Sequence, residues 1–128
     1  TNFEGKAKAA IDAFKSGTEL VYLHVEGIDE VSHLGDLDLK IKAIEDFDSR
    51  LVGRVMKKLE GQDVRFVILP DHPVPILKRL HTTEPVPFAM CGPGIEADAV
   101  QTYSEKNAPQ GKFGLLEKDE LMYLLFKD

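Results

Sequence analysis

The feature that most constrains this fold is a long helical repeat between two short β-like runs. From Asp36 to Glu60, apolar residues recur every three or four positions, which is the period of one face of an α-helix. The stripe consists of Leu37, Ile41, Ile44, Phe47, Leu51, Val55 and Leu59. Residues 20–26 (LVYLHVE) precede it and residues 64–69 (VRFVIL) follow it, and both runs are typical of strands. The order strand, helix, strand predicts a βαβ unit with parallel strands and a right-handed crossover.

The other segments predict the elements around this unit. Asn2 precedes an amphipathic helix that ends near Gly17, Asp36 or Asp38 is expected to cap the long helix, and Gly61 is expected to follow its end. Residues 71–84 contain too many prolines for an ordinary helix. If His81 lies at the same rim of the sheet as Asp71, the next strand, 86–91, starts at that rim and should run antiparallel to its neighbours. Polar residues 92–111 indicate a surface loop with one helical turn, and residues 117–126 indicate a terminal helix.

Together these elements predict an α/β fold in one domain over residues 1–128. We expect three layers, with a central sheet of at least three strands covered by the long helix and the two terminal helices. The sheet should be mostly parallel, with at least one antiparallel strand. No internal repeat and no linker divides the chain.

Composition narrows the class of partner and the compartment. The net charge of −6 argues against binding to nucleic acid, because phosphate recognition needs a basic surface. No apolar run approaches the roughly 20 residues of a membrane span, so no membrane partner is expected. Cys91 is the single cysteine, which excludes an internal disulfide framework and favours a reducing, cytoplasmic location. Lacking a basic neighbour, Cys91 is expected to be a buried, inert thiol.

Acidic and imidazole side chains follow both predicted strands. Asp29 and His33 come after residues 20–26, in a predicted loop or short turn, and their spacing of four would place both on one face of a helical turn. Asp71 and His72 come directly after residues 64–69, and His81 lies in the same proline-rich loop. The carboxyl ends of parallel strands form the binding crevice of α/β sheets, so these groups should share a rim. Carboxylates with imidazoles suit ions such as Zn or Mn.

The spacing leaves open whether Asp71 and His72 bind one ion or are divided between two. Two ions roughly 4 Å apart would stabilise the attacking and leaving oxygens of a phosphoryl transfer. His24 lies within residues 20–26, opposite Leu23 and Val25, and is interpreted as a core residue or a residue behind the ligands. Lys40 and Lys42 could approach a phosphate, although a solvated helix face explains them better. Lys78 and Arg79 could contact an anionic substrate, although solvated loop charges explain them better.

Four motifs in this order carry a family resemblance. They are TNFEGKA at residues 1–7, HVEGIDEVSH at 24–33, ILPDHPVP at 68–75 and HTTEPVP at 81–87, with KIKAIEDFD at 40–48 and GLLEKDELMYLL at 114–125 in agreement. The sequence resembles the carboxy-terminal part of an archaeal-type cofactor-independent phosphoglycerate mutase, in the alkaline phosphatase superfamily. The resemblance covers nearly the whole chain.

The resemblance implies specific roles for the site residues. Asp29, His33 and His81 would hold one metal ion, and Asp71 with His72 would hold a second. Both ions would be divalent, with Mn or Zn favoured and Mg or Co compatible. An Asp and the nucleophilic Ser of the second site would come from the amino-terminal part of the enzyme. The substrate would be phosphoglycerate, and the activity the glycolytic interconversion of its 3- and 2-isomers through a phosphoserine.

The chain also departs from the family pattern. It has no amino-terminal strand with the nucleophilic Ser and no inserted domain, and its motifs read DEVSH and DHPVP where Ala-Gly and DH[ST]TP are usual. We therefore expect a fragment that is inactive alone and needs the rest of the same polypeptide. An exposed sheet edge or face would favour homo-oligomers. The alternatives are a related phosphotransferase, such as a homoserine kinase, and a non-catalytic metal-binding domain.

Overall fold

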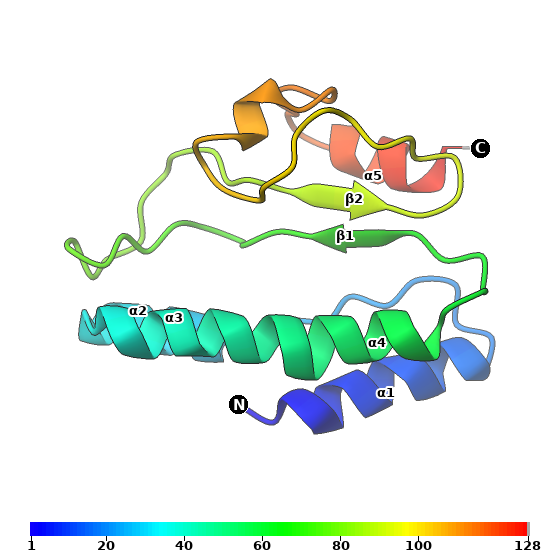
Figure 1. Ribbon diagram of the computed structural model, residues 1–128, viewed down its shortest axis with the longest axis horizontal. Helices are drawn as coiled ribbons and strands as arrows, with labels where there is room; N and C mark the ends of the chain where they lie inside the picture. The colour runs from blue at the N-terminus through cyan, green and yellow to red at the C-terminus, as the bar shows by residue number, and fades with distance from the viewer. Residues whose placement is uncertain (128) are drawn as a thin grey trace. The chain divides into compact units, whose positions relative to one another are not determined.

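The computed structural model describes residues 1–127, which fall into two compact units (Figure 1). Unit 1 consists of Thr1–Gln62 and Val74–His81, and unit 2 of Asp63–Pro73 and the chain from Thr82 onward. Sequence neighbours such as Pro73 and Val74 therefore belong to different units. Within residues 1–127, none of the helices combines the length and the apolar character that crossing a bilayer requires.

The first element of unit 1 is the predicted amino-terminal helix, α1 (Phe3–Lys15). It begins where predicted because the Asn2 side chain accepts a hydrogen bond from the backbone N–H of Gly5, at 2.9 Å. It ends before Gly17, whose φ of +91° suits a glycine. Five apolar residues recur at helical spacing in this segment: Phe3, Ala7, Ala10 and Ile11 are buried, and Phe14 is half-buried.

The predicted long helix is present but changes its winding midway. It consists of α3 (Leu37–Asp46), the π-helical segment η1 (Phe47–Val52) and α4 (Gly53–Lys58), which follow one another as a continuous rod in Figure 1. Asp36 caps it by accepting a hydrogen bond from the Leu39 N–H at 2.9 Å. Gly61, with φ of +79°, lies just past its end.

The π-helical segment corrects the prediction of a single buried stripe. Leu51, Val55 and Leu59 are buried, whereas Leu37, Ile41 and Ile44 are exposed. A π-helix has more residues per turn than an α-helix, so the side-chain face before η1 is rotated relative to the face after it. Helix α3 has no buried residue, so the predicted stripe is buried only from Leu51 onward.

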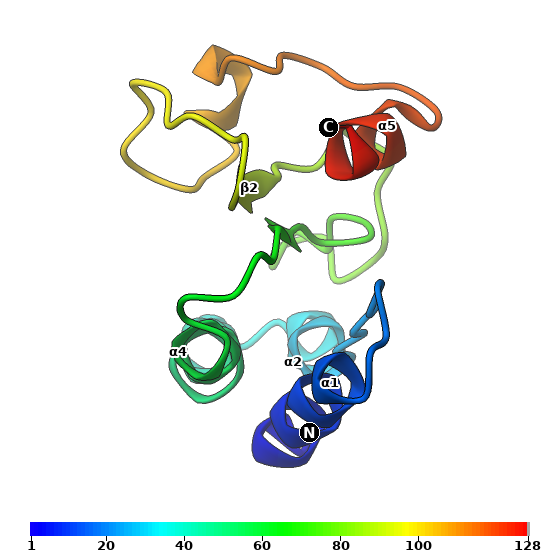
Figure 2. The same cartoon turned by 90° about the vertical axis from the view of Figure 1, so that its right-hand side faces the viewer.

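The core of unit 1 lies between α1 and the second half of the rod. Helix α1 packs against η1 and α4, and Figure 2 shows α1, α2 and α4 nearly end-on. At the edge of this core, the Arg50 guanidinium lies 5.6 Å from the Phe3 ring centroid and forms a 2.6 Å ion pair with Glu4. The buried side chains of unit 1 are Phe3, Ala7, Ala10, Ile11, Ser32, Leu51, Val55, Leu59 and Val74.

The strand predicted at residues 20–26 is absent among residues 1–127. The segment is extended, and its side chains alternate as expected: Tyr22 and His24 are exposed, whereas Leu23 and Val25 are half-buried. An extended segment becomes a strand only when a neighbour supplies ladder hydrogen bonds. The predicted parallel pair, and with it a mostly parallel sheet of at least three strands, is therefore not formed in this part of the chain.

Unit 2 contains the sheet that is formed. Strands β1 (Phe66–Ile68) and β2 (Ala89–Cys91) pair antiparallel, with Phe66 opposite Cys91. This confirms the predicted antiparallel strand. Alternation along β2 leaves Met90 half-buried and Cys91 exposed, so the prediction of a buried thiol is wrong.

Polar side chains bind the loops of unit 2 together. The Arg65 guanidinium donates to the carbonyls of Pro93, at 2.8 Å, and Leu125, at 2.9 Å, and also to that of Lys127. Arg65 thereby connects the turn after β2 to the terminal helix α5 (Glu120–Phe126). The terminal helix and the single helical turn, η2 (Ala108–Gln110), are both present as predicted.

A second anchor in unit 2 is Asp98. Its carboxylate accepts hydrogen bonds from the backbone N–H groups of Val100 and Lys112, both at 2.9 Å. These hydrogen bonds lower the pKa of Asp98 below its ordinary value, and the bond from Lys112 has the larger effect. The carboxylate thus closes the long loop between β2 and α5.

Candidate metal centre

Helix α2 (Gly27–Leu34) carries two of the predicted site residues. The sequence predicted a loop or short turn here, but the segment forms a helix of eight residues, closed by Gly35 with φ of +73°. Helical winding places Asp29 and His33 on one face, as their spacing predicted. Ser32 is buried and donates its hydroxyl hydrogen to the Ile28 carbonyl, at 2.6 Å.

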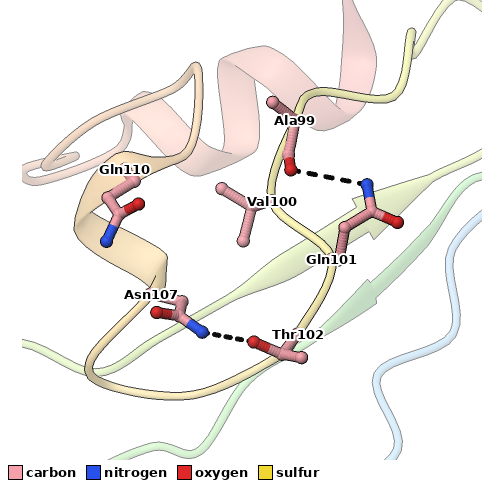
Figure 3. Close-up of a pocket in the computed structure, with 6 residues that line it drawn as sticks. All are labelled: Ala99, Val100, Gln101, Thr102, Asn107 and Gln110. Carbon is pink, nitrogen blue, oxygen red and sulfur yellow. Dashed lines mark hydrogen bonds between the residues drawn. The ribbon is translucent and has the colours of Figure 1, made fainter.

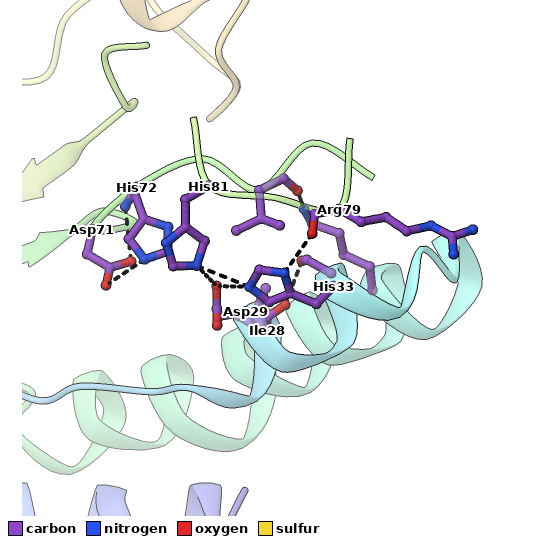
Figure 4. A network of polar contacts seen from close by, with 10 residues as sticks. Ile28, Asp29, His33, Asp71, His72, Arg79 and His81 are labelled. Atoms are coloured by element: carbon purple, nitrogen blue, oxygen red, sulfur yellow. Dashed lines mark hydrogen bonds and ion pairs between the residues drawn. The ribbon is translucent and has the colours of Figure 1, made fainter. Parts of the chain in front are cut away.

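The loop at the end of unit 1 brings His81 to this helix (Figure 4). The Asp29 Oδ1 atom lies 3.3 Å from His33 Nε2 and 3.3 Å from His81 Nε2. The two Nε2 atoms are 3.1 Å apart. All three potential ligand atoms therefore lie within 4.8 Å of one another, although the residues span more than fifty positions of sequence.

The polarity of these atoms fits a bound cation. A carbonyl oxygen only accepts, so the 2.8 Å contact between His33 Nδ1 and the Arg79 carbonyl requires the proton on Nδ1 and leaves a lone pair on Nε2. Asp29 Oδ1 is buried and has no hydrogen-bond partner among residues 1–127. The Asp29 carboxylate oxygen and the His33 lone pair thus converge, and the 3.1 Å contact between the two Nε2 atoms is then a hydrogen bond donated by His81, whose Nε2 proton a bound ion would replace. This donor set suits a divalent ion such as Zn²⁺ or Mn²⁺.

Asp71 and His72 belong to unit 2 and follow β1. The His72 N–H donates to Asp71 Oδ1 at 3.0 Å, and His72 Nε2 lies 3.4 Å from Asp71 Oδ2. Figure 4 shows the two side chains turned toward one another. An exposed carboxylate beside an imidazole is chemically able to ligate an ion, as the sequence predicted for this pair.

The two weaker candidates, His24 and Lys40, do not join the cluster of Asp29, His33 and His81 among the described residues. His24 is exposed, which excludes a core position, and its ring stacks with Tyr22 at 6.4 Å between centroids. The Lys40 ammonium donates to the Val74 carbonyl at 2.8 Å. It therefore anchors the start of the segment that ends in His81.

Sequence reasoning predicts Arg79 to be a solvated loop charge or a contact to an anionic substrate, and it misses the role of the Arg79 backbone. Its carbonyl binds His33, its φ is +56°, and its guanidinium lies over Gly35 so closely that a Cβ atom there would be 2.1 Å from Arg79 Nε. The contribution to His33 comes from a backbone atom, which leaves no side-chain signature in the sequence.

A separate cavity of about 280 Å³ lies in the loop region of unit 2 (Figure 3). Asn107 donates to the Thr102 hydroxyl, and Gln101 donates to the Ala99 carbonyl at 3.4 Å. None of the lining residues is charged, so this cavity offers neither an acid–base pair nor a set of metal ligands. The lining residues are Ala99, Val100, Gln101, Thr102, Asn107 and Gln110.

Comparison with known proteins places these features in a family. The family model of the Metalloenzyme superfamily matches residues 1–128. A 2,3-bisphosphoglycerate-independent phosphoglycerate mutase from Methanothrix thermoacetophila is 47% identical over 127 residues, covering 98% of this chain and 32% of that protein. A probable mutase of the same name from Geobacter sulfurreducens is 44% identical over 121 residues, covering 93% of this chain and 30% of its own length.

The fold is also shared with a solved structure. The PH0037 protein from Pyrococcus horikoshii superimposes with a TM-score of 0.91 at 27% identity, covering 98% of this chain and 37% of that one. The chain thus spans about a third of the length of the mutases that it matches.

Proposed function

Because this chain belongs to the Metalloenzyme superfamily, we propose that it is the carboxy-terminal part of a metal-dependent phosphoglycerate mutase. The whole enzyme would interconvert 3-phosphoglycerate and 2-phosphoglycerate, in a phosphatase-like domain to which residues 1–128 contribute. The observation that carries the proposal is the convergence of Asp29, His33 and His81 on one point. The proposed activity is also the one named for the relatives that match almost the full chain.

Each candidate ligand has a place in this proposal. Asp29, His33 and His81 hold one divalent ion, and Asp71 with His72 holds part of a second site that ligands outside this chain complete. Mn²⁺ and Zn²⁺ are the favoured ions, with Mg²⁺ and Co²⁺ compatible. Bound ions would stabilise the charge that develops on a transferring phosphoryl group. The serine that carries the phosphoryl group lies outside this chain, so residues 1–128 alone are inactive.

Metal binding tests the proposed site directly. We expect calorimetry with Zn²⁺ or Mn²⁺ to detect binding to the 128-residue chain, and His33→Ala or His81→Ala to abolish it. His24→Ala is the matched control, because it removes an exposed imidazole outside the cluster. Retained binding in both ligand variants, or an equal loss in the control, would exclude this site.

Substrate assays separate the mutase from its alternatives. A longer protein that carries this chain should interconvert the two phosphoglycerates without added 2,3-bisphosphoglycerate. A homoserine kinase would instead consume ATP only with homoserine present, and a non-catalytic metal-binding domain would do neither. The names of the relatives favour the first outcome.

We further propose a cytoplasmic location, because a single cysteine, Cys91, cannot form an internal disulfide. We also propose that the chain self-associates through an exposed sheet edge. Each strand of this two-stranded sheet has one edge that pairs with no other strand of the described residues. Light scattering at high protein concentration is expected to detect a dimer. A strictly monomeric species would contradict the self-association.

A further inference from the structure

A strained residue holds the backbone atom on which His33 depends. Arg79 has φ of +56°, in the left-handed region that costs a non-glycine residue free energy. Its N–H donates to the Pro75 carbonyl at 2.9 Å, closing a turn of residues 75–79. The left-handed conformation at the end of this turn directs the Arg79 carbonyl at His33 Nδ1.

We propose that Arg79 is a positioning residue: its left-handed backbone fixes the tautomer and orientation of His33 and so prepares His33 Nε2 to bind the metal. The inference rests on the proposed function in that the ion at Asp29, His33 and His81 is the one proposed above. Histidine ligands commonly donate their other ring N–H to such a second partner, which fixes the ring. Here the partner is a main-chain oxygen of the segment that also carries His81.

The side chain of Arg79 makes a separate contact with the same helix. Its guanidinium lies over Gly35, the left-handed residue that closes α2. A positive charge at the carboxyl end of a helix interacts favourably with the helix dipole. Arg79 therefore contacts α2 twice, through its carbonyl at His33 and through its guanidinium at Gly35.

Two substitutions separate the backbone from the side chain. Arg79→Asn and Arg79→Val both remove the guanidinium, but asparagine tolerates the left-handed region and a β-branched valine does not. Lys118 supplies a matched control in unit 2, because its φ is +55° and it lies outside the cluster. Lys118→Val therefore carries the same kind of strain without touching His33.

Two readouts are needed, one with metal and one without. Imidazole ¹⁵N NMR of the metal-free chain should report His33 protonated on Nδ1 in the wild type, in Arg79→Asn and in Lys118→Val, and a loss of this tautomer in Arg79→Val. Calorimetry with Zn²⁺ alone should give a Kd about 10- to 100-fold weaker for Arg79→Val, the loss typical of removing a ligand's hydrogen-bond partner. Arg79→Asn and Lys118→Val should bind as the wild type does.

The outcomes distinguish this inference from the proposed function. Equal effects of Arg79→Asn and Arg79→Val would assign the role to the guanidinium and overturn the proposal, as would an unchanged tautomer in Arg79→Val. A wild-type chain that binds no metal would reject the proposed metal site. The tautomer measurement would then still decide, on its own, whether Arg79 fixes His33.

Discussion

The two units of this chain are stabilised in different ways. Unit 1 buries a contiguous set of apolar side chains between helix α1 and the second half of the long rod. In the described part of unit 2, every apolar side chain except that of Pro87 is at most half-buried. Arg65 and Asp98 instead form hydrogen bonds with backbone groups of loops distant in the sequence. The cluster of Asp29, His33 and His81 lies in the unit with the packed core, which suits a site whose ligands must be held in place.

The largest effect should come from the core of unit 1. Leu59 is 2% exposed, so Leu59→Ala leaves a cavity and should lower the free energy of unfolding by about 2–5 kcal/mol, measured by urea denaturation. Leu77, also in unit 1 but 94% exposed, supplies the control: Leu77→Ala should change the same quantity by less than about 0.5 kcal/mol. Equal effects of the two substitutions would refute the picture of a packed core.

The next effect should come from Arg65 in unit 2. Arg65→Ala leaves the carbonyls of Pro93 and Leu125 without their charged donor. We expect the free energy of local opening of α5 to fall by about 2 kcal/mol, read from amide hydrogen exchange. Arg65→Lys keeps the positive charge but not the several N–H donors of the guanidinium, so the free energy of local opening should fall by an intermediate amount. Unchanged exchange in α5 after Arg65→Ala would mean that apolar contacts alone stabilise this unit.

This difference also explains what the sequence could predict. Helix α1 and the cap at Asp36 follow from local signals: a 3.6-residue period and a side-chain acceptor. The strand at residues 20–26 could not be predicted in the same way. The alternation of its side chains can be seen in the segment itself. Its pairing with a neighbouring strand depends on residues elsewhere in the chain.

The sequence could predict the side chains of the candidate site but not the backbone atoms that contact them. The spacing of Asp29 and His33 indicated a shared face. His81 was expected nearby on the rim of a parallel strand pair that residues 1–127 do not form. The Arg79 carbonyl at His33, and the π-helical turn that rotates the face of α3, depend on backbone geometry. No residue type encodes either feature, so neither could be deduced from composition or period.

A smaller effect is expected at Asp98, and it should depend on pH. Hydrogen bonds from Lys112 and Val100 lower the pKa of Asp98 below its ordinary value of 3.8. The stabilisation is therefore complete above the unfolded pKa and is lost as the pH falls through the lower, folded value. Exchange of the Lys112 amide should accelerate, relative to its unfolded rate, in this acidic window. Asp98→Asn has one acceptor oxygen for two N–H groups and should remove both part of the protection and its acid dependence.

The smallest effect should come from an ion pair on the surface of unit 1. Arg50 binds Glu4 at 2.6 Å and 3.1 Å and, chiefly through this hydrogen bonding, lowers the pKa of Glu4. The contribution is thus present at neutral pH and lost in acid, as at Asp98. Both side chains are nearly half exposed, so solvent and salt screen the pair.

Glu4→Gln should therefore shift the urea midpoint far less than Leu59→Ala does, and 1 M salt should bring it closer to the wild type. Glu45→Gln makes the same charge change at an exposed position of α3 and serves as the control. If Glu4→Gln destabilised unit 1 as much as Leu59→Ala, the ion pair would be part of its core, and the contrast with unit 2 would fail. If it equals Glu45→Gln, the apolar contacts between α1 and η1 are sufficient to hold α1 in place.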